Sequence, residues 1–162
     1  MSKQSAVADT RIRPLAAGDL ETVIEIDGRH AGRPRRRFFQ KRFDAAGSHP
    51  DGFIHLGIEA HDELVGFALL RVLRGEFGGD EPVAALDVIG VDPTQAGRGY
   101  GRSLLQGIAS TLSEARIHSL RSQAEWKNSE LLRFFEGAGF ELAPRLILER
   151  STSMPFFDSI DD

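Results

Sequence analysis

Residues 91–105 read VDPTQAGRGYGRSLL and run from an apolar strand through a glycine-rich turn into the start of a helix. Gly97, Gly99 and Gly101 alternate with other residues, so the backbone can bend tightly and approach a ligand closely. The helix that follows offers unpaired N–H groups and the positive end of its dipole. The stretch therefore predicts a site for a phosphate-bearing ligand.

Arg98 and Arg102 add two positive charges beside these donors, as an anionic ligand requires. Two better-known phosphate loops do not match the stretch. A P-loop has Lys and then Ser or Thr after its last glycine, whereas Arg102 and Ser103 follow here. The dinucleotide fingerprint needs a third glycine at position 102 and follows the first strand of a βαβ unit, whereas this turn lies past mid-chain. Both loops are excluded.

The turn instead resembles the acyl-CoA loop of the GCN5-related N-acetyltransferases, the GNAT superfamily. That loop has the pattern V-x-P-x-x-Q/R-G-x-G-x-G/A before an amphipathic helix, and Val91, Pro93 and the three glycines occupy its positions. One position departs from it, because Ala96 stands where the family usually has Gln or Arg, and Gln95 comes one residue early. The family's pyrophosphate contacts are mostly backbone N–H groups, so the resemblance implies a cradle that persists with lower affinity.

The composition limits the possible functions. A chain of 162 residues without a low-complexity interruption is long enough for one domain with a sizeable core. With 20 basic and 24 acidic residues, its charge argues against sequence-independent binding to nucleic acid. The absence of cysteine excludes disulfides, thiolate metal sites and a cysteine nucleophile, and we predict no metal site.

Residues 1–10 are small and polar, and no later stretch approaches a membrane-spanning length. We therefore expect a cytoplasmic protein with no membrane partner. Its predicted parts are a flexible N-terminus over 1–10, a single acyl-CoA-binding domain over 11–150 and a mobile C-terminal tail over 151–162.

Hydrophobic periodicity predicts the order of helices and strands. The first half is expected to hold a strand at 11–15, a helix after residue 19, a helix from 33–37 to 47–50, a hairpin of strands at 53–60 and 64–73, a loop at 74–82 and a strand at 83–91. After the glycine turn come a helix to residue 116, a strand at 118–126, a helix capped by Asn128 and stopped by Gly139, and strands at 140–143 and 146–150.

The predicted fold is α/β (α+β), with a central, mostly antiparallel sheet flanked by helices in the order β-α-α-β-β-β-α-β-α-β-β. This is also the element order of the GNAT superfamily, so the resemblance covers most of the chain. Residues 128–140 resemble the family's second recognisable segment, an Asn-led helix that closes in a Gly-Phe pair.

The resemblance implies acetyl-CoA as co-substrate and suggests which residues hold it. Ile89 and Val91 would bind the pantetheine arm, and Asn128 a further part of the cofactor. The pyrophosphate would be held by Gly97, Arg98, Gly99, Gly101 and Arg102. Gly90 is consistent with a bulge that separates the strand from its neighbour, or with a plain strand glycine.

Three residues are candidates for the general base. Asp87 interrupts an apolar strand, and a carboxylate there is costly unless it faces a polar cleft or is paired. It is the first candidate, although a structural carboxylate bonded to backbone or to an arginine has at least equal weight. Glu125 at the end of the next strand is the second. His55 is the third, with simple solvation as its alternative.

The family commonly has a tyrosine on the last helix that protonates the departing thiolate, and Phe135 stands at the matching position. Tyr100 is the only tyrosine in the chain and is expected to be a packing or rim residue. A free thiol has a pKa of about 8.5, so water can supply the proton.

Two charged segments have open interpretations. The basic run RPRRR at 33–37 lies where the family borders the acceptor site, so it either recognises an acidic acceptor or is a solvated helix face. The acidic loop at 76–81 either attracts a cationic amine or is surface.

The sequence therefore predicts an N-acetyltransferase that moves an acetyl group from acetyl-CoA to a primary amine by direct attack in a ternary complex. A protein N-terminus, a lysine, a polyamine, an amino acid and a drug remain open as acceptors. Ala96 and Phe135 motivate an alternative, a non-catalytic acyl-CoA-binding or sensing domain, and an interaction protein that kept only the fold is a third possibility. Exposed strand edges near the C-terminus make a homodimer possible.

Overall fold

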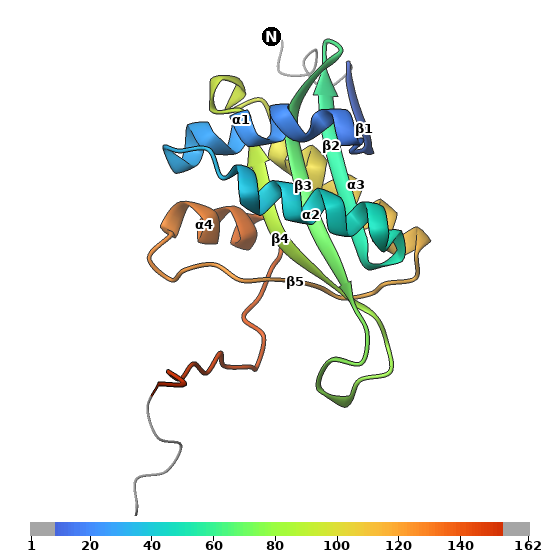
Figure 1. Ribbon diagram of the computed structural model, residues 1–162, viewed down its shortest axis with the longest axis vertical. Helices are drawn as coiled ribbons and strands as arrows, with labels where there is room; N and C mark the ends of the chain where they lie inside the picture. Colours follow the sequence, from blue (N-terminus) through green and yellow to red (C-terminus); the bar gives the residue numbers. More distant parts are fainter. Residues whose placement is uncertain (1–8, 154–162) are drawn as a thin grey trace, which may run out of the picture.

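A five-stranded sheet forms the centre of the computed structural model, which describes residues 9–153 (Figure 1). Its strands lie side by side in chain order: β1 (Thr10–Pro14), β2 (Phe53–Ala60), β3 (Glu63–Leu73), β4 (Val83–Val91) and β5 (Leu120–Ser122). The first three pairings are antiparallel, and β5 is parallel to β4. The mixed, mostly antiparallel sheet confirms the predicted fold class.

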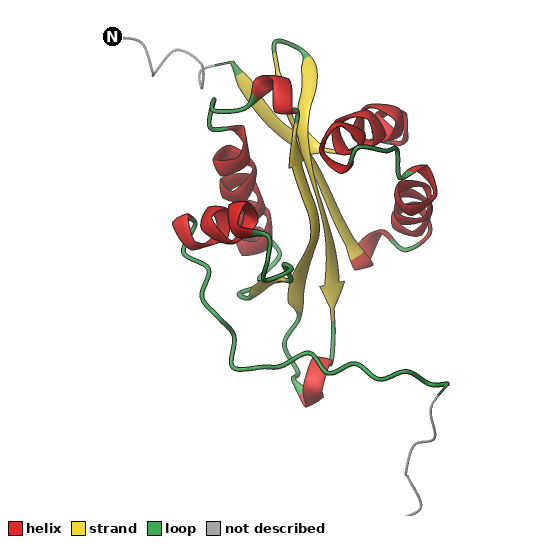
Figure 2. Ribbon diagram, turned by 90° about the vertical axis from the view of Figure 1, so that its left-hand side faces the viewer, coloured by secondary structure: helices red, strands yellow, loops and turns green. Residues whose placement is uncertain are grey.

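Helices cover both faces of the sheet (Figure 2). One face carries α1 (Leu20–Ala31) and α2 (Arg36–Ser48), and the other carries α3 (Tyr100–Glu114) and α4 (Ser129–Gly137). Single-turn 3-10 helices occur at Ala17–Asp19, Pro50–Gly52, Glu76–Gly78 and Pro93–Gln95. Within residues 9–153, no helix is long and apolar enough to cross a membrane. The cytoplasmic location stays a prediction.

A stripe of four side chains fixes α3 on the sheet. Tyr100, Leu104, Ile108 and Leu112 recur every fourth residue, so they share one face of the helix, and all four are buried. Tyr100 is therefore a packing residue. On the opposite face of the sheet, Phe67 of β3 packs edge to face against Phe39 of α2, with ring centroids 5.7 Å apart.

A β-bulge in β4 sets the direction of the site residues. Leu69 of β3 pairs with Val88 and Leu70 pairs with Leu86, so Asp87 is the extra residue of the bulge. The bulge places Asp87 and Val88 on the face that α1 and α2 cover. Gly90 pairs in regular register with Phe67, so the suggested bulge at Gly90 is wrong.

Two predicted closing strands, at 140–143 and 146–150, are also wrong. Residues 138–153 form no helix or strand, and Leu142, Leu146 and Leu148 are 98%, 88% and 88% exposed. A strand requires a hydrogen-bonded partner, and β5 spans only three residues instead of the predicted 118–126. The predicted segments 1–10 and 151–162 fall largely on residues 1–8 and 154–162, which lie outside the described residues.

Candidate active site

A cleft opens where β4 and β5 separate. The two strands pair only over Ala84 to Leu86 and Leu120 to Ser122, and the Ser122 hydroxyl donates to the Leu86 carbonyl at 3.0 Å beside the last pair. Beyond this point β4 continues to Val91 with no partner on that side among the described residues. The resulting cavity has a volume of about 310 Å³.

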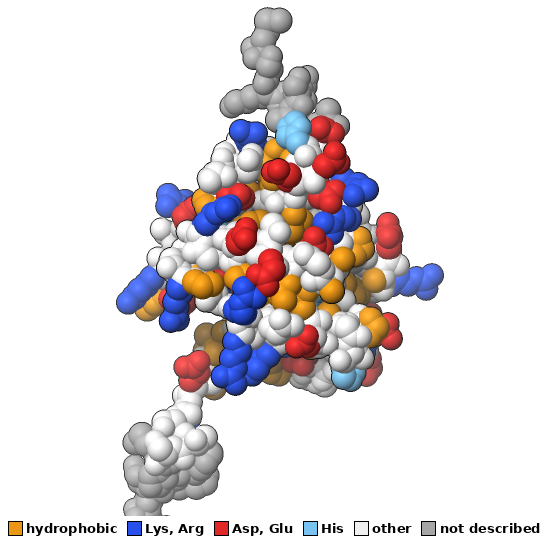
Figure 3. Space-filling model, turned by 45° about the horizontal axis from the view of Figure 1, so that its top comes forward, with side chains coloured by type: hydrophobic (Ala, Val, Ile, Leu, Met, Phe, Trp, Pro, Cys, Tyr) orange, Lys and Arg blue, Asp and Glu red, His pale blue; other side chains and the backbone are white. Residues whose placement is uncertain are grey.

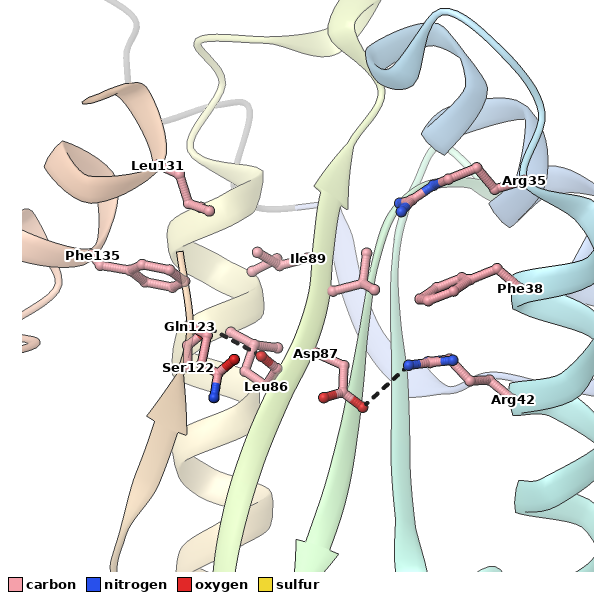
Figure 4. A pocket seen from close by; sticks show the side chains of 11 residues that line it. Arg35, Phe38, Arg42, Leu86, Asp87, Ile89, Ser122, Gln123, Leu131 and Phe135 are labelled. Carbon is pink, nitrogen blue, oxygen red and sulfur yellow. Dashed lines mark hydrogen bonds and ion pairs between the residues drawn. The ribbon is translucent and has the colours of Figure 1, made fainter. Parts of the chain in front are cut away.

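The two walls of the cleft differ in chemistry (Figure 4). Leu131 and Phe135 of α4 form an apolar wall, whereas Arg35, Phe38 and Arg42 form the wall on the α2 side. Between them lie residues 86–89 of β4 and residues 122–123 at the end of β5. The cleft can therefore hold an apolar arm on one side and a charged group on the other.

The glycine turn lies just past the end of β4. Gly97 and Gly99 have φ angles of +78° and +81°, a left-handed conformation that other residues adopt only with strain. Gly99 caps α3, and its carbonyl accepts the bond from the Ser103 N–H at 3.0 Å. The N–H groups of residues 100–102 thus belong to the open first turn of the helix.

The side chains around the turn leave it positive. Arg98 and Arg102 are exposed, and no ion pair among the described residues engages either of them. Gly101 serves close packing, because a Cβ there would lie 3.2 Å from the Phe134 ring of α4. The structure therefore brings the five predicted pyrophosphate residues together at one helix start.

Two side chains at the end of α1 bind the junction between β4 and the glycine turn. The sequence did not predict these contacts. His30 Nε2 donates to the Val91 carbonyl at 2.5 Å, and Arg29 pairs with Asp92 at 2.7 Å. Asp92 also accepts from the Thr94 N–H at 3.0 Å. Two basic residues in the last turn of the helix were the only local indication of these contacts.

The predicted pantetheine and cofactor residues lie on β4 and at the N-cap of α4. Ile89 lines the cleft, and both it and Val91 pack against the core beneath α3. Asn128 is the N-cap of α4, where its side-chain oxygen accepts from the Leu131 N–H at 3.2 Å. This confirms the predicted cap, and the cofactor contact stays a prediction.

Asp87 is the carboxylate that lines the cleft, and it is also paired. Its oxygens accept from Arg71 Nε at 2.7 Å and Nη2 at 3.0 Å, and Arg42 Nη2 lies 4.0 Å away. Asp87 is therefore both a carboxylate bound to an arginine and a residue that faces the cleft. The bulge explains how one side chain meets both conditions.

The other two candidate bases lie outside the cleft lining. Glu125 is exposed in the loop after β5, where its backbone carbonyl accepts from the Asn128 N–H at 2.8 Å. His55 packs between Phe43 and Phe53, and burial together with the charge of Arg42 lowers its pKa to about 4. An imidazole of this pKa is neutral at pH 7 and is a weak base.

Phe135 lies where the resemblance places the family's tyrosine. It is buried, lines the cleft and packs against Phe140 with ring centroids 4.7 Å apart. The side chain has no hydroxyl, and Tyr100 lies in the core beneath α3. The described cleft therefore contains no tyrosine that could protonate a leaving thiolate.

Two of the four arginines of the basic run form ion pairs. Arg35 makes two bonds to Asp27, at 2.7 and 2.5 Å, and Arg36 pairs with Glu21. Basic and acidic side chains also lie mixed over the face shown in Figure 3. Within the run only Arg35 lines the cleft.

The cation that sequence reasoning missed is Arg42. It follows Arg35 by seven residues and Phe38 by four, which is the spacing of one helix face.

The acidic loop at 76–81 precedes β4, whereas the glycine turn follows it, so the two lie at opposite ends of that strand.

Comparisons with known proteins agree with this geometry. A family model described as the acetyltransferase (GNAT) family matches residues 20–140. The mycothiol acetyltransferase of Kocuria rhizophila is 29% identical over 140 residues, which are 81% of this chain and 46% of that protein. The ribosomal protein bS18-alanine N-acetyltransferase of Salmonella typhimurium is 27% identical over 131 residues, which are 80% of this chain and 79% of that protein.

Among solved structures, an aminoglycoside N-acetyltransferase in complex with CoA has a TM-score of 0.70 at 21% identity, covering 88% of this chain and 95% of the other. This likeness shows the shared fold. The chain spans about half the length of the mycothiol acetyltransferase that it matches. Because the family model spans α1 to α4, with the glycine turn and the cleft between them, the chain belongs to the GNAT family of acetyltransferases, which use acetyl-CoA as co-substrate.

Proposed function

We propose that the protein is an N-acetyltransferase that moves an acetyl group from acetyl-CoA to a primary amine by direct attack in a ternary complex. The observation that carries this proposal is the cleft between β4 and β5, which lies beside a positively charged helix start. Acetyl-CoA supplies an activated thioester, so the chain needs mainly to bind and orient the two reactants.

The turn fits a pyrophosphate in three respects. Its left-handed glycines have no atom within 4 Å of the position that a Cβ would take, so a ligand can approach the backbone. The first turn of α3 offers N–H groups, and Arg98 and Arg102 add charge. Gly97, Gly99 and the residues at 100–102 would hold the pyrophosphate, Ile89 and Val91 the pantetheine arm, and Asn128 a further part.

Asp87 is the best-placed group to receive the proton of the acceptor amine. It lines the cleft, and Glu125 and His55 do not. Because both oxygens of Asp87 already accept from Arg71, we assign the transfer to a water molecule between the amine and the carboxylate. Water also protonates the leaving thiolate, since Phe135 has no acidic group.

The proposal is tested by release of the CoA thiol from acetyl-CoA in the presence of a panel of amines. The panel holds amino acids, amino-terminal peptides, lysine, polyamines and aminoglycosides. We expect at least one amine to raise the initial rate well above the rate of hydrolysis, with the acetylated amine identified by mass spectrometry. If acetyl-CoA binds and no amine is acetylated, the protein is a sensing domain instead.

We further propose that the protein forms a homodimer through residues 142–148 and the outer edge of β5. Leu142, Leu146 and Leu148 are almost fully exposed, and β5 pairs only with β4 among the described strands. An apolar segment and an open strand edge are both stabilised by pairing with a second copy.

We expect sedimentation equilibrium to show a dimer at micromolar concentration, and Leu148→Gln to raise its dissociation constant at least about tenfold, because a buried leucine contributes about 1.5–3 kcal/mol. Ala109→Gln, on the exposed side of α3, is the matched control and leaves the constant unchanged. A wild type that stays monomeric at every concentration contradicts the proposal.

A further inference from the structure

The α2 wall of the cleft holds an arginine whose hydrogen bonding is incomplete. Arg42 Nε is buried and has no hydrogen-bond partner among the described residues, and 30% of the side chain is exposed. A buried N–H group without an acceptor lowers stability, because it has lost its bonds to water. The side chain lines the cleft from the α2 side (Figure 4).

The neighbouring carboxylates are already occupied. Both oxygens of Asp87 accept from Arg71, at 2.7 and 3.0 Å, and Arg42 Nη2 reaches Asp87 only at 4.0 Å. Asp27 is held by two bonds from Arg35. Three arginines thus share two carboxylates, and Arg42 is the one that lacks a close partner.

Two other neighbours of Arg42 do not balance its charge. The centroid of the Phe38 ring lies 3.7 Å from the guanidinium carbon, a cation–π contact that orients the group. His55 cannot supply a negative charge, and with a pKa of about 4 it adds no positive charge at pH 7. The cleft therefore presents one guanidinium in excess.

We infer that the acceptor carries an oxyanion, a carboxylate or a phosphate, near its amine, and that Arg42 binds this group. The inference rests on the proposed acetyl transfer, whose acceptor it specifies. A guanidinium binds carboxylates and phosphates through paired, charge-assisted hydrogen bonds. The oxyanion pairs with the exposed part of the Arg42 guanidinium and neutralises the excess charge.

The same geometry limits the charge of the acceptor. The cleft of about 310 Å³ has room for the reacting end of acetyl-CoA beside the amine-bearing end of an acceptor. A polyamine would place several positive charges beside Arg42, with the one carboxylate of the cleft lining already bound to Arg71. Like charges that are close together in the cleft repel one another, and this disfavours polycationic acceptors.

The first test compares amines that differ only in the oxyanion. Glycine is paired with glycinamide, glucosamine 6-phosphate with glucosamine, and spermidine represents polycations. We expect the wild type to prefer the oxyanion-bearing member of at least one pair about tenfold or more in kcat/KM, through a lower KM. The pair with the larger ratio tells carboxylate from phosphate.

Variants of α2 assign the preference to Arg42. Arg42→Gln is expected to raise the KM for the preferred acceptor about tenfold and to leave its uncharged counterpart unchanged, and Arg42→Lys is expected to retain part of the preference. Arg37→Gln, exposed on the same helix, is the matched control and keeps the wild-type values. Equal rates for both members of each pair, or a preference for spermidine, would overturn the inference.

A binding measurement separates this inference from the proposed function. The Arg42 Nε–H resonance, assigned by its loss in Arg42→Gln, is followed by NMR in protein saturated with CoA. N-acetylglycine or N-acetylglucosamine 6-phosphate should shift it, and N-acetylglycinamide and N-acetylglucosamine should not.

A shift without acetylation of any amine would refute the transferase proposal and leave the oxyanion site in place. Acetylation without a shift and without a charge preference would refute the oxyanion site alone.

Discussion

Gly99→Glu is expected to weaken acetyl-CoA binding at least about 100-fold, measured by calorimetric titration. Gly99 has a φ angle of +81° and caps α3, so a side chain there is strained and projects beside the first turn of the helix. The new carboxylate would face the pyrophosphate. Two like charges about 4 Å apart in a partly buried site repel by about 4 kcal/mol, which exceeds the 2.7 kcal/mol of a 100-fold change.

Gly75→Glu is the matched control for this experiment. Gly75 has a φ angle of +75° and, like Gly99, open space where a Cβ would stand, so the variant has the same strain and the same charge. It lies in the loop between β3 and β4, at the other end of β4 from the turn. We expect normal acetyl-CoA binding by Gly75→Glu, and similar melting temperatures for both variants. Normal binding by a folded Gly99→Glu would show that the turn is not the cradle.

Asp87→Asn is expected to lower kcat about 100-fold with little change in the affinity for acetyl-CoA. Asparagine has nearly the same size and can still accept a bond from Arg71, but it cannot take up a proton at neutral pH. A positioned acid–base group contributes about 10²- to 10⁴-fold, and transfer through water to an arginine-bound carboxylate belongs at the lower end of that range.

Glu125→Gln tests the competing base in the same assay. Glu125 is exposed and does not line the cleft, so its kcat should equal that of the wild type. Because Asp87→Asn leaves Arg71 without a charged partner, the melting temperature and acetyl-CoA affinity of each variant are measured alongside. A large loss in Glu125→Gln together with full activity in Asp87→Asn would move the base from β4 to the loop after β5.

The parts of the fold with strong local patterns were predicted closely. The strands at 53–60 and 83–91 have the predicted bounds, and Asn128 caps α4 as expected. Gly139 follows α4 with a φ angle of +84°, a conformation that glycine adopts without strain. The cap and the stop of α4 depend on interactions within a few residues of the chain, and the two strands have the apolar pattern of buried strands, so the local sequence indicates all of them.

The C-terminal strands show the opposite case. Residues 140–150 have the composition of a strand, but a strand is stable only against a partner, and β5 offers three residues. Phe140 packs against Phe135, whereas Leu146 and Leu148 meet no core in the described structure. Local pattern therefore could not decide whether this segment pairs.

The features of the candidate site also divide into those that the local sequence predicts and those that depend on the tertiary structure. By itself, the sequence determined the glycine turn, its two arginines and Asp87 as a carboxylate in an apolar strand, because backbone conformation and the cost of a buried charge follow from residue type and near neighbours. Only the tertiary structure decided that a bulge turns Asp87 toward α2, that Arg71 binds it, and that Arg42 remains without a close partner in the cleft. These contacts join β3, β4 and α2, segments far apart in the chain, so they depend on strand register and helix packing that no short stretch of sequence contains.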